Sequence, residues 1–499
     1  MEIELKLVCE PDAVTAFENK VVPILKAKNI VFDKSSANLY NEYFDTPDEF
    51  FGQRKMGFRV RAKNNNFEQT IKTKGNVVGG LHQRPEYNIA LKSNTPDLTL
   101  FDSDIWAEKL DLEQINKALS GLFLTNFDRT TFLVKNDEFI IEIVFDLGEV
   151  RRAQDYLPIC EIELELVKGD PSHLYNIAEL IVENLPTRLS DVTKAARGYQ
   201  LLHGSILESK YLPSFLSLEK QDSTEQAFCK MLEIGLRHWQ HHQQVYLQTS
   251  KLKALTQIRE AISLLLQGVA LYLPTLQCKE LLGLHKDLLK LAQAWAWQEQ
   301  LQSIHQLRSK KGPFSKRIPK SQNLMNYLMG RREGLLNAFK PQQLCMSTIS
   351  SNVQLAISRA LYEKPWKIQN SGADTPVIKH ANGWLSQTWQ TVQQSLPSNS
   401  KMDDKQYLAL EVLLRQSLIN GFLLADLFAE SRGQFRAPWL DLATGIQELK
   451  SLKLLHDSSL DIQVDDRAEF MAWIEDKTHS VIKVMEQSRE VAMNADIYW

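Results

Sequence analysis

Charged and apolar residues alternate strictly over residues 2–7 at the start of the chain. Residues two apart in a β-strand lie on the same face. Glu2, Glu4 and Lys6 therefore share one face, and the apolar residues that alternate with them share the other. The pattern predicts a strand with one apolar face and one ionised face.

The same alternation returns in five further segments before residue 167. A single charged strand face is usually solvated. Six such faces, with acids and bases gathered on different strands, are not expected of an ordinary surface, and a run of carboxylates is unfavourable unless cations neutralise it. The ionised faces comprise Glu2, Glu4 and Lys6; Arg59, Arg61 and Lys63; Lys72 and Lys74; Arg84 and Glu86; Glu142 and Asp146; and Glu161, Glu163 and Glu165.

One arrangement accommodates all these strands: a closed antiparallel barrel with helices outside and the charges in its lumen. Helical spacing of apolar residues predicts a helix over residues 11–28, with Pro23 interrupting it. Residues typical of helix ends predict two more, over 106–119 and 171–185. Residues 190–203 are expected to return the chain to the charged strands with Lys194 and Arg197. The N-terminal part is therefore expected to be an α+β domain. Its lumen would suit a polyanion together with a divalent metal ion.

Strand patterns nearly vanish beyond residue 218, where leucine-rich segments with a period of 3.6 take over. They predict an all-α helical bundle, with two sub-bundles that meet near residues 309–320. The expected organisation is a domain over 1–204, a linker over 205–217 and a helical domain over 218–499. The predicted helices cover residues 255–273, 278–304, 344–362, 407–428 and 470–493.

Composition narrows the class of protein. At 499 residues the chain is too long for one core. We expect no membrane span, because no apolar run has the required length, and no signal peptide, because the first residues form a charged strand. Five scattered cysteines without a Cys-x-x-Cys motif indicate a reducing cytoplasm.

Net charge differs between the two parts, at roughly −8 for residues 1–210 and roughly +5 for the rest. The second part lacks the basic density of a dedicated nucleic-acid binder. We therefore expect no specific nucleic-acid partner, and a monomer.

With these motifs in place, residues 1–204 resemble the CYTH superfamily, the triphosphate tunnel metalloenzymes. The resemblance rests on the six charged motifs in order and on Thr193-Lys194, which resembles the terminal Ser-Lys motif of that family with Thr in place of Ser. It implies a closed eight-stranded antiparallel tunnel that hydrolyses a triphosphate with Mg²⁺ or Mn²⁺.

The helical part resembles a CHAD domain, an all-helical module that often follows CYTH and is linked with polyphosphate. Arg259 and Arg415 fit the basic positions of its helices, but Thr256 stands where the motif has a histidine. The two parts together resemble the two-domain CYTH-CHAD inorganic triphosphatases, and the resemblance implies a polyphosphate contact through the helical part.

The sequence contains no Gly-x-x-x-x-Gly-Lys loop, so side chains must bind the phosphates. Arginine forks suit bidentate phosphate contacts, and lysines act as point charges. The predicted substrate-binding residues are Lys6, Arg59, Arg61, Lys72, Lys74, Arg84, Arg129 and Lys194.

Magnesium prefers hard oxygen ligands. Glu2, Glu4, Glu161 and Glu163 are the expected metal ligands, and the further ligands or their supports are Glu165, Glu142 and Asp146.

We expect in-line attack of water on a terminal phosphorus. Either a carboxylate of the acidic wall or a second metal ion orients that water, and Glu86 is an alternative to Glu161 or Glu163. No Ser, Cys or His nucleophile is indicated. The residues expected to take part in catalysis are Glu2, Glu4, Lys6, Lys72 and Glu163.

Two other functions fit the sequence. The same fold could hydrolyse nucleoside triphosphates, thiamine triphosphate or an RNA 5′-triphosphate, or act as an adenylate cyclase. Alternatively, the protein could bind or sense polyphosphate without catalysis, although a binder has little use for a full acidic wall.

Overall fold

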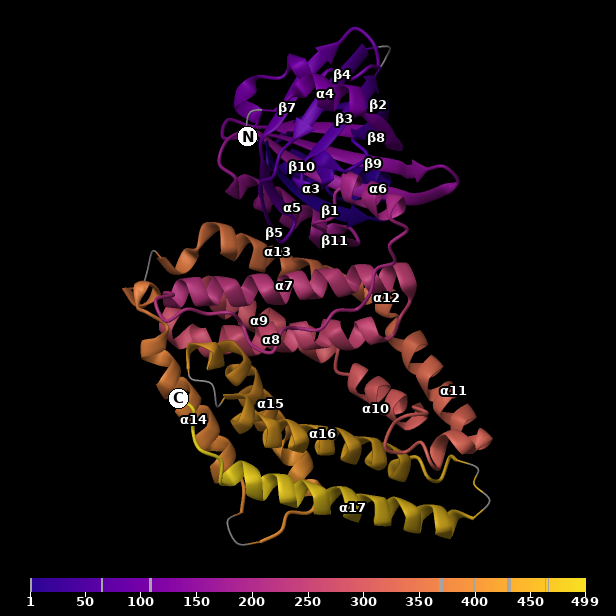
Figure 1. Cartoon of the computed structure of the whole chain (residues 1–499), viewed down its shortest axis with the longest axis vertical. Coiled ribbons are helices and arrows are strands. Elements are labelled where there is room, and N and C mark those ends of the chain that lie inside the picture. The colour runs from indigo at the N-terminus through magenta and orange to yellow at the C-terminus, as the bar shows by residue number, and fades with distance from the viewer. Residues whose placement is uncertain are drawn as a thin grey trace. The chain divides into compact units, whose positions relative to one another are not determined.

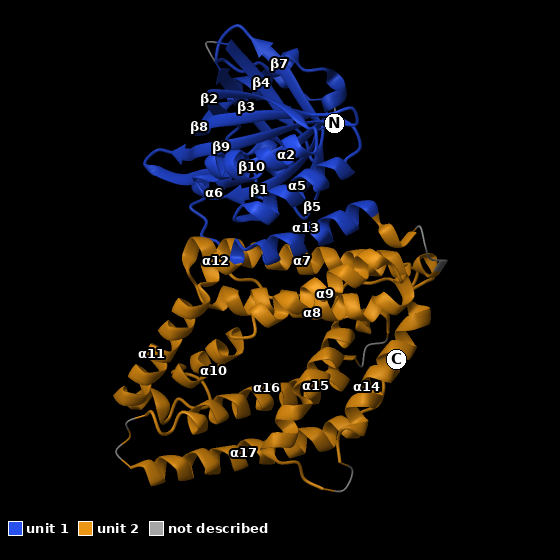
Figure 2. Ribbon diagram, turned by 180° about the vertical axis from the view of Figure 1, so that it is seen from behind, with its two compact units in different colours: residues 1–208, 345–363 blue, residues 209–344, 364–499 orange. Residues whose placement is uncertain are grey.

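The computed structural model describes residues 2–63, 66–106, 110–367, 371–397, 400–428, 432–462, 464 and 466–499 (Figure 1). The chain forms two compact units (Figure 2). Unit 1 comprises Met1–Glu208 and Cys345–Glu363, and unit 2 comprises Ser209–Leu344 and Lys364–Trp499.

Unit 1 is built on one curled antiparallel sheet in the order β5-β6-β1-β10-β9-β8-β2-β3-β4-β7, with β11 paired to β1 (Figure 1). The predicted combination of a charged antiparallel sheet with outer helices is confirmed. The strands are β1 (Glu2–Cys9), β2 (Val31–Asp45), β3 (Gly57–Lys63), β4 (Asn66–Lys72), β5 (Asn76–Val78), β6 (Leu81–Arg84), β7 (Glu86–Leu91), β8 (Ser120–Lys135), β9 (Ile140–Arg152), β10 (Asp155–Lys168) and β11 (Thr187–Leu189).

The sheet has eleven strands where eight were expected. The extra strands arise because the segment after β4 folds into the short strands β5 and β6 before β7, and because β11 pairs with residues 7–9 of β1, beyond the part of β1 that pairs with β6. Within the described residues, β5 and β7 are the two ends of the ladder. Ion pairs from β4 to β1, described below, join the walls across the lumen.

Strand register explains why the charges gather on one face. Residues directly opposite in an antiparallel pair lie on the same side of the sheet. Lys6 of β1 lies opposite Glu163 of β10, and Asp146 of β9 lies opposite both Glu161 of β10 and Arg129 of β8. The alternation in sequence thus becomes a continuous ionised surface across four strands.

The other face of these strands carries the core. Leu5, Leu7 and Leu164 are fully buried there, and they pack with Phe17 of α1 (Ala13–Lys20) and Ile181 of α5 (Ser172–Asn184). Removal of such apolar surface from water, at about 25 cal/mol per Å², drives the packing.

The predicted helix over 11–28 is divided at Val21 into α1 and α2 (Val22–Ala27), and Pro23 occupies the first turn of α2. The helix predicted over 106–119 is shorter: α4 (Leu112–Ala118) begins after Asp111, whose side chain accepts a hydrogen bond from Gln114 N–H. Residues 107–109 of that prediction lie outside the described residues. The other helices of this part are α3 (Phe50–Gln53) and α6 (Lys194–Leu202).

A helix from the second half of the sequence, α13 (Thr348–Glu363), belongs to unit 1 (Figure 2). Leu355 is 1% exposed and joins the core of the sheet. Ser358 lies 3.1 Å from the Tyr175 hydroxyl and donates to the Val78 carbonyl at 3.2 Å, and Ser351 donates to the Thr187 carbonyl. The predicted limits of 1–204 and 218–499 did not anticipate this crossing.

Unit 2 is helical, as predicted. The predicted helix over 278–304 is two helices, because the chain turns at Trp295–Trp297 between α9 and α10. The elements are α7 (Thr224–Thr249), α8 (Lys253–Leu276), α9 (Lys279–Ala294), α10 (Gln298–Arg308), α11 (Gln322–Phe339), α12 (Pro341–Cys345, whose last residue belongs to unit 1), α14 (Ile378–Gln394), α15 (Asp404–Leu424), α16 (Arg432–Asp457) and α17 (Arg467–Met493).

Among the described residues, one helical stretch, Asp404–Leu427, is long and apolar enough to cross a membrane by length and composition. The sequence analysis expected no apolar run of that length, and this helical stretch is an exception. In the structure, 56% of its most apolar window is buried. A buried helix in a protein core passes the same test.

Candidate functional site

Three carboxylates form an acidic centre on the ionised face of unit 1. Asp146 of β9 and Glu161 and Glu163 of β10 each offer an oxygen within 4.8 Å of the others. The side chains of Asp146 and Glu161 are fully buried, whereas that of Glu163 is 13% exposed. Hard oxygen atoms this close together can hold a divalent metal ion.

Four cations surround this centre. The ammonium group of Lys194 lies 2.7 Å from Asp146 and 3.0 Å from Glu163, and it also bonds Glu161. Arg129 binds Asp146 in a bidentate manner at 2.6 and 2.7 Å. The other two pairs are Lys6 with Glu163, and Arg197 with Glu161 at 2.6 Å.

Helix α6 delivers two of these cations. The Thr193 side chain accepts a hydrogen bond from Ala196 N–H, which fixes Lys194 as the first residue of the helix. Arg197 follows three positions later, on the same side of the helix. This local geometry explains why Thr can replace the Ser of the resembled motif, since both are good caps.

The cations keep the acidic centre ionised. Burial alone would raise the pKa of Glu161, but Arg197, Lys194 and Lys6 outweigh it and lower that pKa to about 2. Lys194, Lys6 and Arg129 likewise hold the pKa of Glu163 well below its ordinary value against the effect of burial.

A second cluster links β1 to β4, β6 and β7. Lys72 lies 2.6 Å from Glu2 and 3.0 Å from Glu86, and Arg84 donates to Glu4 at 2.9 Å. Burial raises the pKa of Glu2 to about 7, and the opposing effect of Lys72 is too small to prevent it. For Glu4, burial also acts to raise the pKa, but Lys6, Lys72 and His82 together outweigh it and lower the pKa to about 2.

A basic wall faces these acids. Burial first, and then repulsion from Arg59 and Arg129, lowers the pKa of Arg61 to about 9. Its Nε donates to the neutral Asn41 amide at 2.8 Å. In the described part of the chain, the buried Nε atoms of Arg59 and Arg84 have no hydrogen-bond partner. Arg59 and Arg84 thus form ion pairs, with Glu86 at 3.7 Å and Glu4 at 2.9 Å, but each keeps a donor that an anion's oxygen could satisfy.

Lys74 is the predicted residue that lies away from this face. The predicted residues that lie on it are Glu2, Glu4, Lys6, Arg59, Arg61, Lys72, Arg84, Arg129, Asp146, Glu161, Glu163 and Lys194. Strand β4 ends at Lys72, Thr73 N–H donates to the Pro85 carbonyl at 3.1 Å, and Lys74 is exposed beyond it. Gly75 follows, where a Cβ atom would lie 2.1 Å from the Gln83 carbonyl oxygen. Glu165 lies opposite Glu4 and Glu142, so it shares the ionised face, and burial raises its pKa.

Sequence reasoning missed His82, and it brought Arg197 to the site with Lys194 without giving it a role. His82 is fully buried, lies opposite Glu4 in the register, and its Nδ1 is 3.4 Å from Arg84 Nη2. Burial lowers the pKa of His82 to about 4, so its imidazole is neutral at pH 7. The alternation of residues 81–84 already placed His82 on the face of Arg84, and the i, i+3 spacing from Lys194 could have indicated the role of Arg197.

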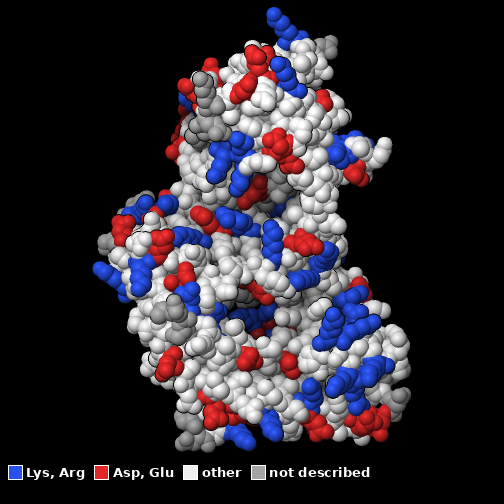
Figure 3. Space-filling model, in the orientation of Figure 1, with Lys and Arg blue, Asp and Glu red and all other residues white. Residues whose placement is uncertain are grey.

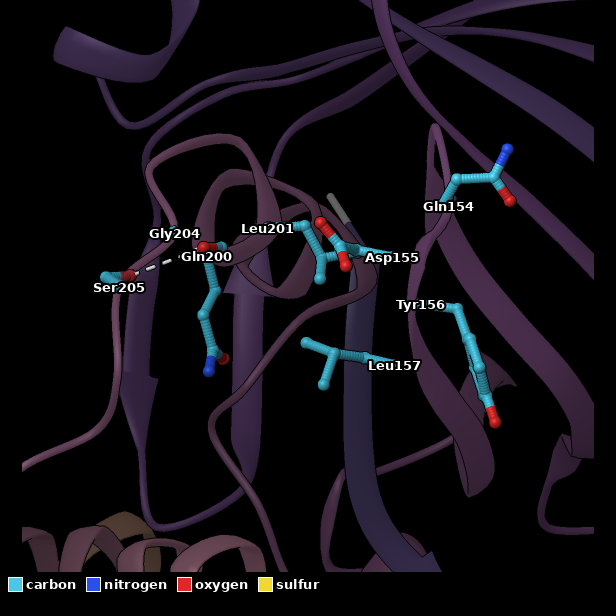
Figure 4. A pocket seen from close by; sticks show the side chains of 8 residues that line it. All are labelled: Gln154, Asp155, Tyr156, Leu157, Gln200, Leu201, Gly204 and Ser205. Atoms are coloured by element: carbon cyan, nitrogen blue, oxygen red, sulfur yellow. Dashed lines mark hydrogen bonds between the residues drawn. The ribbon is translucent and has the colours of Figure 1, made fainter.

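A separate cavity of about 340 Å³ lies where the β9–β10 turn meets the end of α6 (Figure 4). Tyr156 and Gln154 line one side, Gln200 lines the other, and Ser205 Oγ donates to the Gln200 carbonyl. None of its lining residues belongs to the predicted site.

Comparisons with known proteins show similarity to a protein family and to a curated protein. Residues 1–199 match the CYTH domain family. The inorganic triphosphatase of Haemophilus influenzae is 34% identical over 239 residues, which cover 47% of this chain and 65% of that protein. The match thus spans less than two thirds of the relative's length.

Solved structures show more distant likenesses. A Hippeastrum protein that has a dominant triphosphatase activity is 16% identical over 43% of this chain and 98% of its own, with a TM-score of 0.28. The CHAD domain of the plant Ricinus communis is 10% identical over 58% of this chain and 99% of its own, with a TM-score of 0.42.

Proposed function

We propose that this chain, whose residues 1–199 form a CYTH domain, is a triphosphatase that hydrolyses inorganic triphosphate to diphosphate and phosphate in unit 1. One observation carries the proposal: arginines with unsatisfied buried donors face a cluster of ionised carboxylates in the same lumen. The name of the Haemophilus influenzae relative supports this choice of substrate.

Phosphate binding falls to the basic wall. The Nε atoms of Arg59 and Arg84 have no hydrogen-bond partner, although that of Arg84 lies 3.8 Å from Glu2, and they could donate to phosphate oxygens. An anion beside Arg61 would relieve the repulsion that lowers its pKa. Lys72 would act as a point charge, and the exposed Lys74 would contact the outer end of a phosphate chain.

The carboxylates fit a divalent cation by their donor chemistry, since Asp146, Glu161 and Glu163 present three hard oxygens within 4.8 Å. Glu2, Glu4 and Glu165 would add to this set from the same face. Bound Mg²⁺ or Mn²⁺ would offset charge on the phosphate oxygens. Lys6 and Lys194 already bond these carboxylates, so they compete with such an ion and are available for phosphate when it is present.

Water attacks a terminal phosphorus in line with the leaving oxygen. We assign the orientation of that water to Glu163, because its side chain is the most exposed of the acidic centre and its lowered pKa keeps it ready to accept a hydrogen bond. Glu86 is the alternative, since its pKa also falls to about 2 and Lys72 links it to Glu2.

Polyphosphate contact through unit 2 gains little support. Arg259 and Arg415 both bond Glu299, and Lys450 bonds Glu299 and Glu411, so two carboxylates already bind both arginines of the resembled motif and offset part of the charge of these three cations. Exposed Lys and Arg side chains gather instead near α11 and residues 309–320 (Figure 3). A polyanion would meet that exposed surface first.

The products test the proposal. Phosphorus NMR of the reaction of purified protein with inorganic triphosphate and Mg²⁺ or Mn²⁺ should show diphosphate and phosphate in equal amounts. Glu4→Gln should abolish metal-dependent turnover without loss of fold, whereas Glu10→Gln, an exposed residue just beyond β1, should not. Full activity of Glu4→Gln would remove Glu4 from the metal-ligand set.

A further inference from the structure

Two cysteines face each other across neighbouring strands of unit 1. Cys9 ends β1, and Cys160 lies in β10. Val8 pairs with Glu161, and the same register continued by one residue places Cys9 opposite Cys160. Their sulfur atoms are 3.8 Å apart, and both cysteines carry free thiols.

This placement satisfies the geometry of a disulfide. Opposite residues in an antiparallel pair have Cα atoms about 4.5 to 5.5 Å apart. Disulfides need Cα atoms about 4.4 to 6.8 Å apart and an S–S bond of about 2.05 Å. Rotation of the two side chains can therefore close the bond without movement of the strands.

The two thiols of the pair also differ in their exposure to solvent. Cys160 is only partly buried, whereas Cys9 is 7% exposed. Cys160 is therefore the thiol of the pair that a dissolved disulfide can reach first. Burial raises the pKa of Cys229, Cys278 and Cys345, so these thiols are less reactive.

We propose that Cys9 and Cys160 are a redox-sensitive modification site that forms a reversible intramolecular disulfide in the presence of a low-molecular-weight disulfide such as oxidised glutathione. The Cys160 thiolate attacks one glutathione sulfur and releases the other half as a thiolate. Cys9 then gives up its proton, attacks Cys160 and releases the second glutathione thiolate. Two protein thiols are oxidised and one glutathione disulfide is reduced to two thiols.

The link would act beside the candidate site but does not rest on the proposed function. Cys160 directly precedes Glu161, which holds Arg197 and Lys194. The two cysteines are 151 residues apart in sequence, so the bond would close a long loop of the unfolded chain. Such closure raises the stability of the folded state relative to the unfolded one.

The test is oxidation of the full-length native protein with oxidised glutathione, followed by thiol counting in denaturant and peptide mass spectrometry without reduction. The free thiol count should fall from five to three, with one peptide pair that joins Cys9 to Cys160. The midpoint of thermal unfolding should rise by several degrees and return after reduction with dithiothreitol.

Matched variants separate the pair from the other cysteines. Cys9→Ser should leave Cys160 as a mixed disulfide with glutathione and give no rise in the unfolding midpoint. Cys278→Ser should form the link as the wild type does. The proposal is overturned if the wild type keeps five free thiols at full oxidation, if Cys160 retains glutathione, or if the linked peptides contain another cysteine.

Discussion

At the scale of residues, the acidic centre depends on its cations more than on burial. Glu161 is completely buried, and it is ionised only because Arg197, Lys194 and Lys6 surround it. Removal of one charge from such a network leaves its partners buried without a counter-charge. The resulting loss of folding free energy exceeds what the intact pair contributes. This reciprocity makes single substitutions in the lumen informative.

Glu161→Gln should lower the free energy of unfolding of unit 1 by about 3 to 5 kcal/mol, because Arg197 and Lys194 lose their shared carboxylate. The pKa of Glu161 is about 2 in the fold against 4.5 when unfolded. Its stabilisation is therefore complete above about pH 4.5 and is lost as the pH falls towards 2. Urea unfolding as a function of pH measures both effects.

Glu183→Gln, an exposed residue of α5, is the matched control and should leave stability within about 0.5 kcal/mol of the wild type. If Glu161→Gln shows the same stability and the same acid dependence as the wild type, the ion network described here is wrong.

His82 is expected to position Arg84 and not to react itself. Its Nδ1 lies 3.4 Å from Arg84 Nη2 and remains a neutral acceptor at pH 7. His82→Leu removes this acceptor and should lower kcat/KM for triphosphate about tenfold, because the guanidinium group of Arg84 would no longer be held in its orientation. His82→Asn places an oxygen near the Nδ1 position and should restore most of the activity.

Steady-state kinetics of the two variants at matched folded fractions separates positioning from packing. Equal losses in both variants would mean that His82 acts by its volume, and wild-type kinetics in His82→Leu would show that Arg84 needs no such support.

At the scale of elements, the alternation of residues predicted which side chains share a face, because strand geometry fixes that face once the strand is known. Lys74 continues the alternation in sequence, but the last ladder pair of β4 with β3 is Lys72 with Gly57. The alternation does not encode where this pairing ends or the close packing of Gly75 against Gln83 that follows. Helical spacing likewise predicted a helix over 344–362 but could not show which core its apolar face joins. The packing of α13 on unit 1 depends on contacts distant in sequence, such as Ser358 with Val78.

Leu355→Ala in α13 should therefore destabilise unit 1, by about 2 to 5 kcal/mol, because Leu355 is 1% exposed in the core of the sheet. Hydrogen exchange of the backbone amides of α5 and β1 should quicken. Leu288→Ala, a fully buried residue of α9, should instead quicken exchange in unit 2. Unchanged protection of α5 in Leu355→Ala would contradict the assignment of α13 to unit 1.

At the scale of the whole molecule, the chain leaves unit 1 after Glu208, returns at Cys345 and leaves again after Glu363. Unit 1 is therefore discontinuous in sequence. The segment predicted as a separate helical domain, residues 218–499, thus supplies α13 to unit 1, a structural role that requires no polyphosphate. The charged face of unit 1 remains the only place among the described residues where acids cluster with the spacing of a metal site.

The central claim is that this face hydrolyses inorganic triphosphate. Its most direct test is phosphate release by the full-length protein from inorganic triphosphate, ATP, thiamine triphosphate and long polyphosphate, with Mg²⁺ or Mn²⁺. The account predicts a strong preference for inorganic triphosphate, complete loss with a chelator, and a fall of about 100-fold or more in Glu163→Gln. Absence of release from all four substrates, or full activity in Glu163→Gln, would contradict it.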